Sequence, residues 1–354
     1  MDSLLINLSF LLPQPTGITN YVLNLLPHLS LPATLLAAQD VPGFSRYGVP
    51  SNLTPRQGTM GHFRRLVWTQ VQIPQIYRNL RASLLFSPIP EAPLSCQCRF
   101  VVMVHDLIPL RFPRLGSPLT PYFRHYIPQV LGQAVHILCN SQATAQDLLD
   151  FYGIAAAKIT PIPLAVERDR FFPRPAPVEC PYFLYLGRPD PYKNLGRLIA
   201  AFADLPRDYQ LWLAGPQDRR YTPKLQAQCS ELGIANRVRW LSYVPAADLP
   251  GILSNALALV FPSLWEGFGL PVLEAMACGT PVITSNLAAL PEVTGDAALL
   301  VDPYNTDALA DAMKAIATDG TLRSTLGRLG QTRASQFTWA KTGYDTREIL
   351  QQYM

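Results

Sequence analysis

Residues 261–283 read FPSLWEGFGLPVLEAMACGTPVI and decide the fold of this chain. An apolar run enters this stretch from Ala258 and predicts the end of a buried strand. The turn Gly267–Gly269 follows, Pro271 stands at a position favoured for the first helical residue, and Gly279 marks the end of the helix. The β-branched residues after Gly279 predict another strand. The stretch therefore predicts a strand, a glycine turn, a short helix and a second strand.

This arrangement points backbone N–H groups and the positive end of a helix at one spot, which suits phosphate or a polyhydroxylated sugar. Two acids flank that spot. Glu266 lies in the turn and Glu274 about one helical turn into the helix, so we expect both to reach a bound ligand. Two other interpretations are an ordinary β-turn-α connection and a dinucleotide fingerprint. The fingerprint lacks its third glycine, because Pro271 and Val272 occupy that region.

Composition predicts a large two-domain protein, because 354 residues exceed a single ordinary core. Hydrophobic residues make up 49% and charged residues 15%, yet no uninterrupted apolar run approaches the roughly 18 residues of a membrane-spanning helix. The first residues, MDSLLINLSFLLPQPTG, lack the basic segment and the cleavage site of a signal peptide, and a buried first strand fits them better.

The six cysteines are scattered apart from Cys96-x-Cys98, and no second pair completes a zinc pattern. We interpret them as reduced cytosolic thiols and expect no metal site. The net charge is +4 without an arginine-rich tract. That modest excess argues weakly for contact with a membrane surface or an acidic lipid, and poorly for nucleic acid.

Strand-like and helix-like segments alternate along the chain, which predicts parallel sheets covered by helices. A proline-rich stretch at 161–181, with six prolines, indicates a linker between two lobes. Ligands of open parallel sheets bind outside the carboxyl ends of the strands. The expected strands are Leu4–Phe10, Phe100–His105, Val135–Asn140, Tyr182–Leu186, Gln210–Ala214 and Val238–Leu241, and the expected helices are Ile18–Leu29, Ala143–Phe151 and Asn194–Leu205.

A basic loop, Gly187–Asn194, follows the first strand of the second half and reads GRPDPYKN. Arg188 and Lys193 on one short loop that opens a helix predict a cationic clamp for a diphosphate. The alternative is a solvated basic loop. No DxD metal-binding triplet occurs in the chain, so the two cations would stabilise the charge of a leaving diphosphate in place of a metal.

The string E-G-F-G-L-P followed by E-A-M-A-C-G-T-P-V-I resembles the donor-sugar signature of the retaining GT-B glycosyltransferases of family 4. The resemblance covers nearly the whole chain. It implies an α/β fold of the GT-B type, with two Rossmann-like parallel-sheet lobes facing a cleft. The implied parts are an acceptor-side domain at 1–165, a linker at 166–181, a nucleotide-sugar donor domain at 182–336, and a terminal helix at 337–354 that crosses back to the first domain.

The resemblance also implies roles for individual residues. Glu274 is expected to bond the ribose hydroxyls, since a carboxylate accepts two hydroxyl donors. Glu266 is expected to face the transferred sugar as a catalytic residue. The other donor-binding positions are Arg188 and Lys193 on the pyrophosphate, the backbone N–H groups of Phe268, Gly269 and Leu270 on sugar hydroxyls or phosphate oxygens, and Val244 against the base.

In the first half, His105 closes the strand RFVVMVHD. By position alone its ring can face the site or bond a nearby loop carbonyl. The string H-D-L-I-P-L is typical of mannosyl-type members of the family, in which the histidine contacts the donor sugar. Gly17 would let backbone approach the donor phosphate or the acceptor. This loop departs from the family, which usually has two consecutive glycines and often an arginine where Asn20 stands. Ser141 either approaches the same site or caps the following helix.

Residues 62–82, HFRRLVWTQVQIPQIYRNLRA, mix four arginines with aromatic and aliphatic residues at near-helical spacing. Such a pattern suits an interfacial patch that meets a lipid-linked acceptor. A buried helix with snorkelling arginines fits the same pattern. The residues concerned are Arg64, Arg65, Arg78 and Arg81 with Phe63, Trp68, Ile73, Ile76 and Tyr77.

The implied function is a retaining, metal-independent transfer of a hexose from a nucleoside diphosphate to a glycan or a lipid-linked saccharide in polysaccharide biosynthesis. Mannose from GDP-mannose is the first expectation and UDP-glucose the next, with no cofactor besides the donor. The implied location is the cytoplasm, including the inner face of the membrane. The alternatives are a nucleotide-sugar epimerase of the same fold and a non-catalytic sugar-binding protein.

Overall fold

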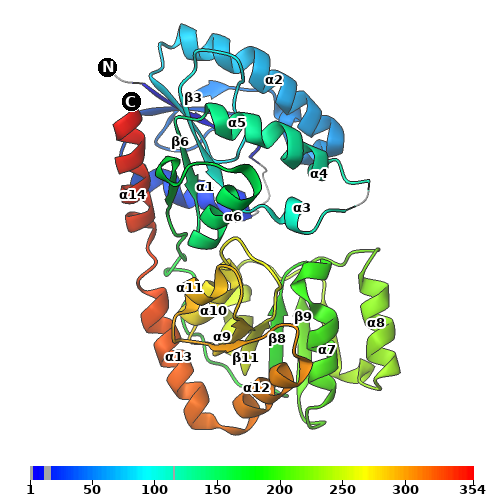
Figure 1. Ribbon diagram of the computed structural model, residues 1–354. Coiled ribbons are helices and arrows are strands. Elements are labelled where there is room, and N and C mark those ends of the chain that lie inside the picture. The colour runs from blue at the N-terminus through cyan, green and yellow to red at the C-terminus, as the bar shows by residue number, and fades with distance from the viewer. Residues whose placement is uncertain (1–2, 12–16, 115) are drawn as a thin grey trace. The chain divides into compact units, whose positions relative to one another are not determined.

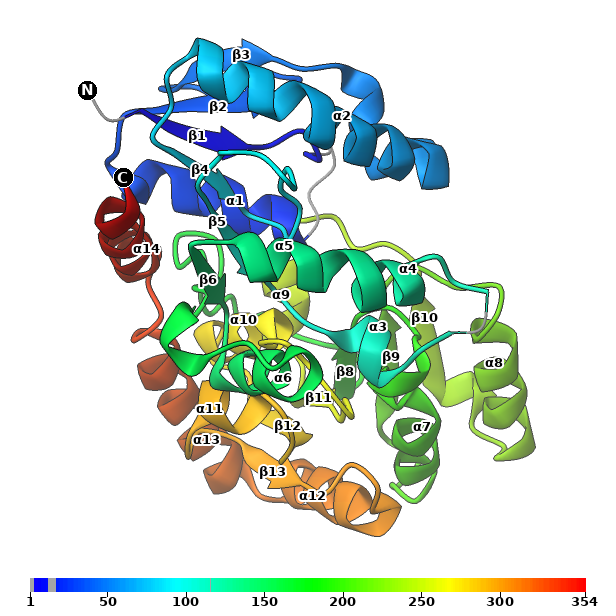
Figure 2. The ribbon, with the colours of Figure 1, turned by 45° about the horizontal axis from the view of Figure 1, so that its top comes forward.

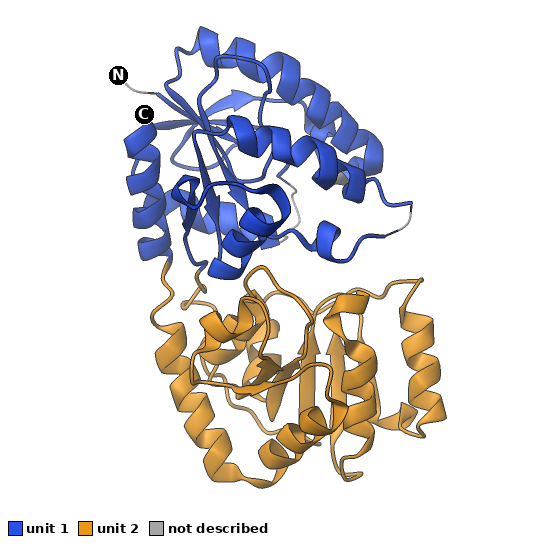
Figure 3. Cartoon of the chain, in the orientation of Figure 1, with its two compact units in different colours: residues 1–164, 339–354 blue, residues 165–338 orange. Residues whose placement is uncertain are grey.

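The computed structural model describes residues 3–11, 17–114 and 116–354. The chain forms two compact units, residues 1–164 with 339–354 and residues 165–338 (Figure 3). Each unit holds one parallel sheet covered by helices (Figure 1). The predicted α/β class, with a Rossmann-like parallel sheet in each of two units, is confirmed.

The sheet of the first unit is parallel in every pairing between its described strands and has the order β3-β2-β1-β4-β5-β6-β7. The chain order reverses between β1 and β4, the kind of switch point at which open parallel sheets bind ligands. The strands are β1 Leu4–Asn7, β2 Ala33–Ala37, β3 Ser45–Gly48, β4 Leu84–Ser87, β5 Phe100–Val104, β6 His136–Cys139 and β7 Ile159–Pro161.

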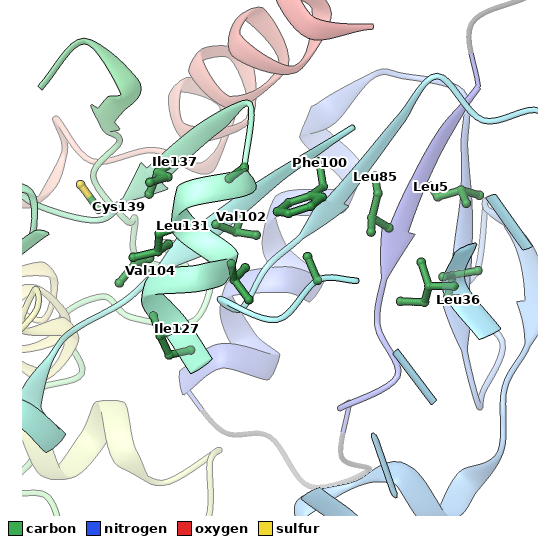
Figure 4. Packing of buried hydrophobic residues seen from close by; sticks show 14 of the residues in the cluster. Leu5, Leu36, Leu85, Phe100, Val102, Val104, Ile127, Leu131, Ile137 and Cys139 are labelled. Carbon is green, nitrogen blue, oxygen red and sulfur yellow. The ribbon is translucent and has the colours of Figure 1, made fainter. Parts of the chain in front are cut away.

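The core on one face of this sheet is made by alternate strand residues, because side chains of a strand point to opposite faces in turn. Leu5, Leu85 and Val102 belong to one buried cluster with Leu131 of the covering helix α5, and Leu131 lies beside Val102 (Figure 4). Each such fully buried side chain contributes about 1.5–3 kcal/mol. The helices of this unit are α1 Gly17–Leu29, α2 Gly58–Asn79, α3 Ile108–Arg111, α4 Leu119–Pro121, α5 Ile127–Gln133, α6 Gln142–Tyr152 and α14 Trp339–Tyr353, with a π-helical turn at Tyr122–Tyr126.

The last helix, α14, packs against α1 of the first unit. A Cβ atom on Gly343 would stand 2.4 Å from the Cβ of His28, so the two helices approach more closely there than any larger residue allows. The hydroxyl of Thr342 donates to the carbonyl of Pro163 at 2.8 Å, and the hydroxyl of Tyr353 bonds Nδ1 of His136 at 3.0 Å.

The sheet of the second unit has the order β10-β9-β8-β11-β12-β13, again parallel in every described pairing. Its switch point lies between β8 and β11. The strands are β8 Tyr182–Leu186, β9 Gln210–Ala214, β10 Val238–Leu241, β11 Ala258–Phe261, β12 Val282–Ser285 and β13 Leu299–Val301. The helices are α7 Leu195–Ala203, α8 Thr222–Glu231, α9 Leu249–Ser254, α10 Leu270–Ala277, α11 Leu290–Thr294, α12 Thr306–Thr318 and α13 Gly320–Ala334.

Strands β8, β9 and β10 begin and end at the predicted residues, and β11 covers the apolar residues predicted as the end of a buried strand. The first strand is shorter than predicted, because the side-chain oxygen of Asn7 accepts the N–H of Ser9 at 3.2 Å and turns the chain. Helix α7 begins at Leu195 and not at the predicted Asn194, because Asn194 has a left-handed backbone with φ of 64°. Helix α10 begins at Leu270, so Pro271 is its second residue and not its first.

Candidate functional site

Two loops meet at the switch point of the second sheet. One follows β8 and carries Arg188 and Lys193, and the other follows β11 and carries Glu266. The N–H of Leu264 in the second loop donates to the carbonyl of Tyr192 in the first at 2.7 Å. The Asn194 amide donates to the carbonyl of Pro262 at 3.1 Å. The two loops therefore form one bonded surface at the carboxyl edge of the sheet, where a ligand is expected.

Lys193 and Glu266 form a nearly buried ion pair on this surface. Nζ of Lys193 lies 2.6 Å from Oε1 of Glu266, and the two side chains are only 13% and 10% exposed. The lysine nitrogen also stands 5.1 Å from the ring centre of Phe261. Removing one partner of such a pair leaves an uncompensated charge, which is strongly destabilising. Two residues singled out from separate motifs are thus brought together.

Arg188 is held more loosely. Its side chain is 61% exposed, and its guanidinium nitrogens lie 3.6 Å from Asp190 and 3.9 Å from Asp218. Both distances exceed a hydrogen bond. Asp218 bonds Arg220 more tightly, at 2.6 Å, and those hydrogen bonds hold the pKa of Asp218 well below its usual range. The guanidinium of Arg188 therefore remains accessible to an anion from solvent.

The glycine turn before α10 has the geometry of an anion site. Gly269 caps the helix with φ of 108°, and a Cβ at this position would stand 2.8 Å from a methyl of Leu290. Both facts restrict the position to glycine. Phe268 is buried, and the centre of its ring lies 6.0 Å from that of Phe337. This packing anchors the turn. Pro271 has no N–H, and the amides of Val272 and Leu273 donate to the carbonyl of Gly269 at 3.0 and 3.3 Å. The N–H groups suited to a ligand are therefore those at the end of the turn and at Leu270, where the helix begins.

Glu274 lies one turn further along α10 and faces residues 167–170. Burial raises the pKa of this carboxyl to about 8; the positive charge of Arg170 lowers it and the negative charge of Glu167 raises it. Near neutral pH the unliganded protein thus holds much of Glu274 in its protonated form.

Glu274 gives the protein a pH-dependent stability. When the pKa of a carboxyl is higher in the folded than in the unfolded chain, the protein loses stability as pH rises from the unfolded-state pKa to the folded-state pKa. We expect Glu274→Gln to match the wild-type melting temperature near about pH 4 and to exceed it at about pH 8, because the folded-state pKa is about 8. Thermal melts across this range measure the difference. A difference of equal size at every pH would show that the carboxyl does not titrate as its burial implies.

In the first unit, His105 follows β5 with its Nε2 atom 3.0 Å from the carbonyl of Pro88. A carbonyl only accepts, so Nε2 carries the proton and Nδ1 of the neutral ring is an acceptor. The ring packs edge-on against Tyr21, with centres 5.0 Å apart. Burial lowers the pKa of His105 to about 4. Such a histidine accepts a hydrogen bond from a hydroxyl near neutral pH and does not act as a proton donor there.

The other candidates lie on loops and helix ends. Gly17 begins α1, and no described atom lies within 4 Å of where its Cβ would stand. Pro15 and Thr16 of the same predicted loop lie outside the described residues. Val244 is half-buried in the loop after β10. The hydroxyl of Ser141 accepts the N–H of Thr144 at 3.0 Å, so this serine is the N-cap of α6.

The first unit also holds a cavity of about 590 Å³ at the ends of β1 and β2. Apolar residues such as Leu23 and Val41 line part of it, and Gln39, Asp40 and Gln57 supply polar groups. A mixture of apolar wall and a few polar side chains is typical of a small-molecule site.

Three residues of the candidate site were not predicted from the sequence. Tyr185 donates its hydroxyl to the carbonyl of Arg188 at 2.9 Å and so supports that loop from beneath. Asp218 follows β9, at the carboxyl edge of the sheet where site residues are expected. Its position after a predicted strand could have identified it as a site residue. Ser263 follows β11, and its buried hydroxyl has no hydrogen-bond partner within the described part of the chain.

Within the described residues, no cluster of three or more histidine, cysteine or acidic side chains could hold a metal ion. No helix in that part of the chain is long and apolar enough to cross a membrane.

Two family descriptions match the chain, "Glycosyltransferase Family 4" over residues 15–170 and "Glycosyl transferases group 1" over residues 167–333. O-antigen chain mannosyltransferase B of Escherichia coli is 35% identical over 68% of this chain and 67% of its own length. O-antigen chain mannosyltransferase RfbU of Salmonella typhimurium is 28% identical over 88% of this chain and 90% of its own length.

Among solved structures, HepE of Anabaena in complex with UDP-glucose matches 99% of both chains with a TM-score of 0.78 at 18% identity. This likeness shows the GT-B fold. The two family matches and the 35% identical relative show that the chain is a glycosyltransferase. The chain belongs to the group 1 glycosyltransferases of family 4, as the sequence resemblance implied.

Proposed function

We propose that the second unit binds a nucleoside-diphosphate sugar and that the protein transfers its hexose, mannose first, to a glycan or a lipid-linked saccharide in polysaccharide biosynthesis. The observation that carries the proposal is the Lys193–Glu266 pair, which sets a cation and a carboxylate 2.6 Å apart on a surface shared by two loops. The similarity to proteins named as O-antigen mannosyltransferases favours mannose.

We assign each site residue of the second unit a role that suits its charge and its hydrogen-bonding groups. Arg188 and Lys193 contact the diphosphate, and their cations stabilise the leaving group without a metal ion. The amides of Phe268, Gly269 and Leu270 bond the oxygens of phosphate or sugar. Glu274 bonds the ribose, and Val244 packs on the base. Because the ribose hydroxyls donate to Glu274, a bound donor favours its ionised form.

Glu266 faces the reacting sugar, and its negative charge stabilises the positive charge that develops at the anomeric carbon. In the first unit, neutral His105 is suited to accept a hydrogen bond from a hydroxyl of the donor sugar, and Gly17 leaves room for a ligand at the start of α1. In a retaining transfer, the bond from the anomeric carbon to the phosphate oxygen breaks and the acceptor oxygen bonds on the same face. The acceptor proton passes to the leaving diphosphate.

The acceptor saccharide is proposed to occupy the cavity of about 590 Å³ in the first unit. Asp40 and Gln57 on its wall are suited to sugar hydroxyls, because a carboxylate accepts hydrogen bonds and an amide both donates and accepts them.

A donor panel tests the proposal. Purified protein is offered GDP-mannose, UDP-glucose and a non-hexose nucleotide sugar, with a lipid-phosphate saccharide as acceptor, and the released nucleoside diphosphate is measured. We expect the highest rate with GDP-mannose, the next with UDP-glucose, and no loss of rate with EDTA. Exclusive use of the non-hexose donor would refute the substrate assignment. Strict dependence on added Mg²⁺ or Mn²⁺ would refute the role given to the two cations.

A further inference from the structure

Helix α2 carries an exposed apolar stripe on its outer face. Met60, Phe63, Val67 and Val71 are each between 48% and 61% exposed. Their spacing of three and four residues places them along one face of the helix. The stripe extends over about 16 Å, because each helical residue adds 1.5 Å. In Figures 1 and 2, α2 lies at the periphery of the first unit.

The inner face of α2 fixes which side points outward. Arg65 is buried and donates to both oxygens of Glu91, at 2.6 and 2.7 Å. Gln70 donates to the carbonyl of Ala92 at 3.1 Å, and Ile73 packs in the core. The helix cannot rotate to bury its stripe without breaking this ion pair.

The structure therefore decides in part between the two interpretations of residues 62–82. Ile73 and Ile76 are buried and Trp68 and Tyr77 pack against the core, so these four do not form an exposed patch. The buried-helix interpretation describes the inner face, although Arg65 is ion-paired and does not snorkel. The exposed apolar face consists of other residues, of which only Phe63 was singled out beforehand.

The charged side chains in the part of the sequence that contains the stripe have a single sign. Between Asp40 and Glu91 the sequence has six arginines, no lysine and no acidic residue. Arg64 on α2 is exposed next to the stripe, and Arg78 continues the same face after Val71. A helix with apolar residues on its outer face, and with arginine but no lysine or acidic residue in its sequence, has the composition of an interfacial helix that binds anionic lipid.

We propose that the stripe of Met60, Phe63, Val67 and Val71, with Arg64, docks the protein on an anionic phospholipid surface. The stripe begins three residues after Gln57, which lines the cavity of the first unit. A lipid-linked acceptor could then have its carrier in the bilayer and its saccharide in the cavity. This last link rests on the proposed function, whereas binding to lipid does not.

Vesicle flotation of the whole protein, without donor or acceptor, tests the proposal. We expect binding to phosphatidylcholine vesicles that contain phosphatidylglycerol, little binding to phosphatidylcholine alone, and weaker binding as salt is added. Arg64→Gln should weaken binding about fivefold. Phe63→Ser combined with Val67→Ser should weaken it about tenfold or more.

Matched controls are Leu232→Ser and Arg328→Gln, which change exposed residues of the second unit. Both should bind as the wild type does, and melting temperatures establish that every variant is folded. Absence of wild-type binding, equal losses in the control variants, or a dimer that Phe63→Ser dissociates would overturn the proposal. The stripe variants should keep their rate with a soluble acceptor. Vesicle binding without any sugar transfer would instead refute the proposed function and leave this inference standing.

Discussion

Replacement of Glu266 by glutamine is expected to lower kcat about 100-fold or more, because the variant keeps the shape but loses the charge beside the reacting sugar. The affinity for nucleoside diphosphate should stay the same or rise, since the positive charge of Lys193 is no longer neutralised at 2.6 Å. Glu274→Ala should do the opposite. It removes hydrogen bonds made in both ground and transition states, so KM should rise about 10- to 100-fold with kcat unchanged.

Three measurements on the two variants separate these effects: kcat, affinity for nucleoside diphosphate, and melting temperature. Glu266→Gln retains a hydrogen-bond acceptor for Lys193, so it is a better test than alanine, which leaves that lysine unpaired. A wild-type kcat in folded Glu266→Gln would contradict the catalytic assignment. Unfolding of both variants would mean that the two acids serve only to hold the loop and helix.

Loss of either cation is expected to reduce kcat/KM by about 30- to 1000-fold, equivalent to about 2–4 kcal/mol of transition-state stabilisation. The two variants should differ in stability. Arg188→Ala should melt as the wild type does, because the side chain is 61% exposed. Lys193→Ala should melt at a lower temperature, since it leaves Glu266 buried without its partner.

The double variant Lys193→Met with Glu266→Gln tests this difference, because it removes both charges at once. It should recover much of the lost melting temperature and none of the activity. Arg207→Ala is a matched control, since Arg207 is exposed at the opposite end of β9. Full activity in Arg188→Ala, or an equal loss in Arg207→Ala, would contradict the clamp.

The sequence predicted the site loops well because their signals are local. A buried apolar run followed by glycine and proline defines both the end of a strand and the start of a helix, so β8 has its predicted bounds and β11 ends as predicted. The contact between Lys193 and Glu266 could not be predicted from spacing. The two residues are 73 positions apart and meet only because β8 and β11 are neighbours in the sheet.

Helix α2 shows a different limit. Apolar residues occur on both of its faces, so periodicity alone does not tell which face is buried. The choice depends on the distant Glu91, which binds Arg65 and orients the helix. For His105 the sequence left two alternatives open, a ring that faces the site and a ring bonded to a loop carbonyl. Nε2 donates to the carbonyl of the distant Pro88, which leaves Nδ1 as the acceptor.

The anomeric configuration of the first product tests the central claim most directly. The claim is that this site transfers a sugar from a nucleoside diphosphate with retention. Proton NMR of a reaction with GDP-α-mannose and a saccharide acceptor records the configuration before any equilibration. An α-linked mannoside formed in step with released GDP is the predicted result. A β-linked product, or release of free mannose without any glycoside, would contradict the account.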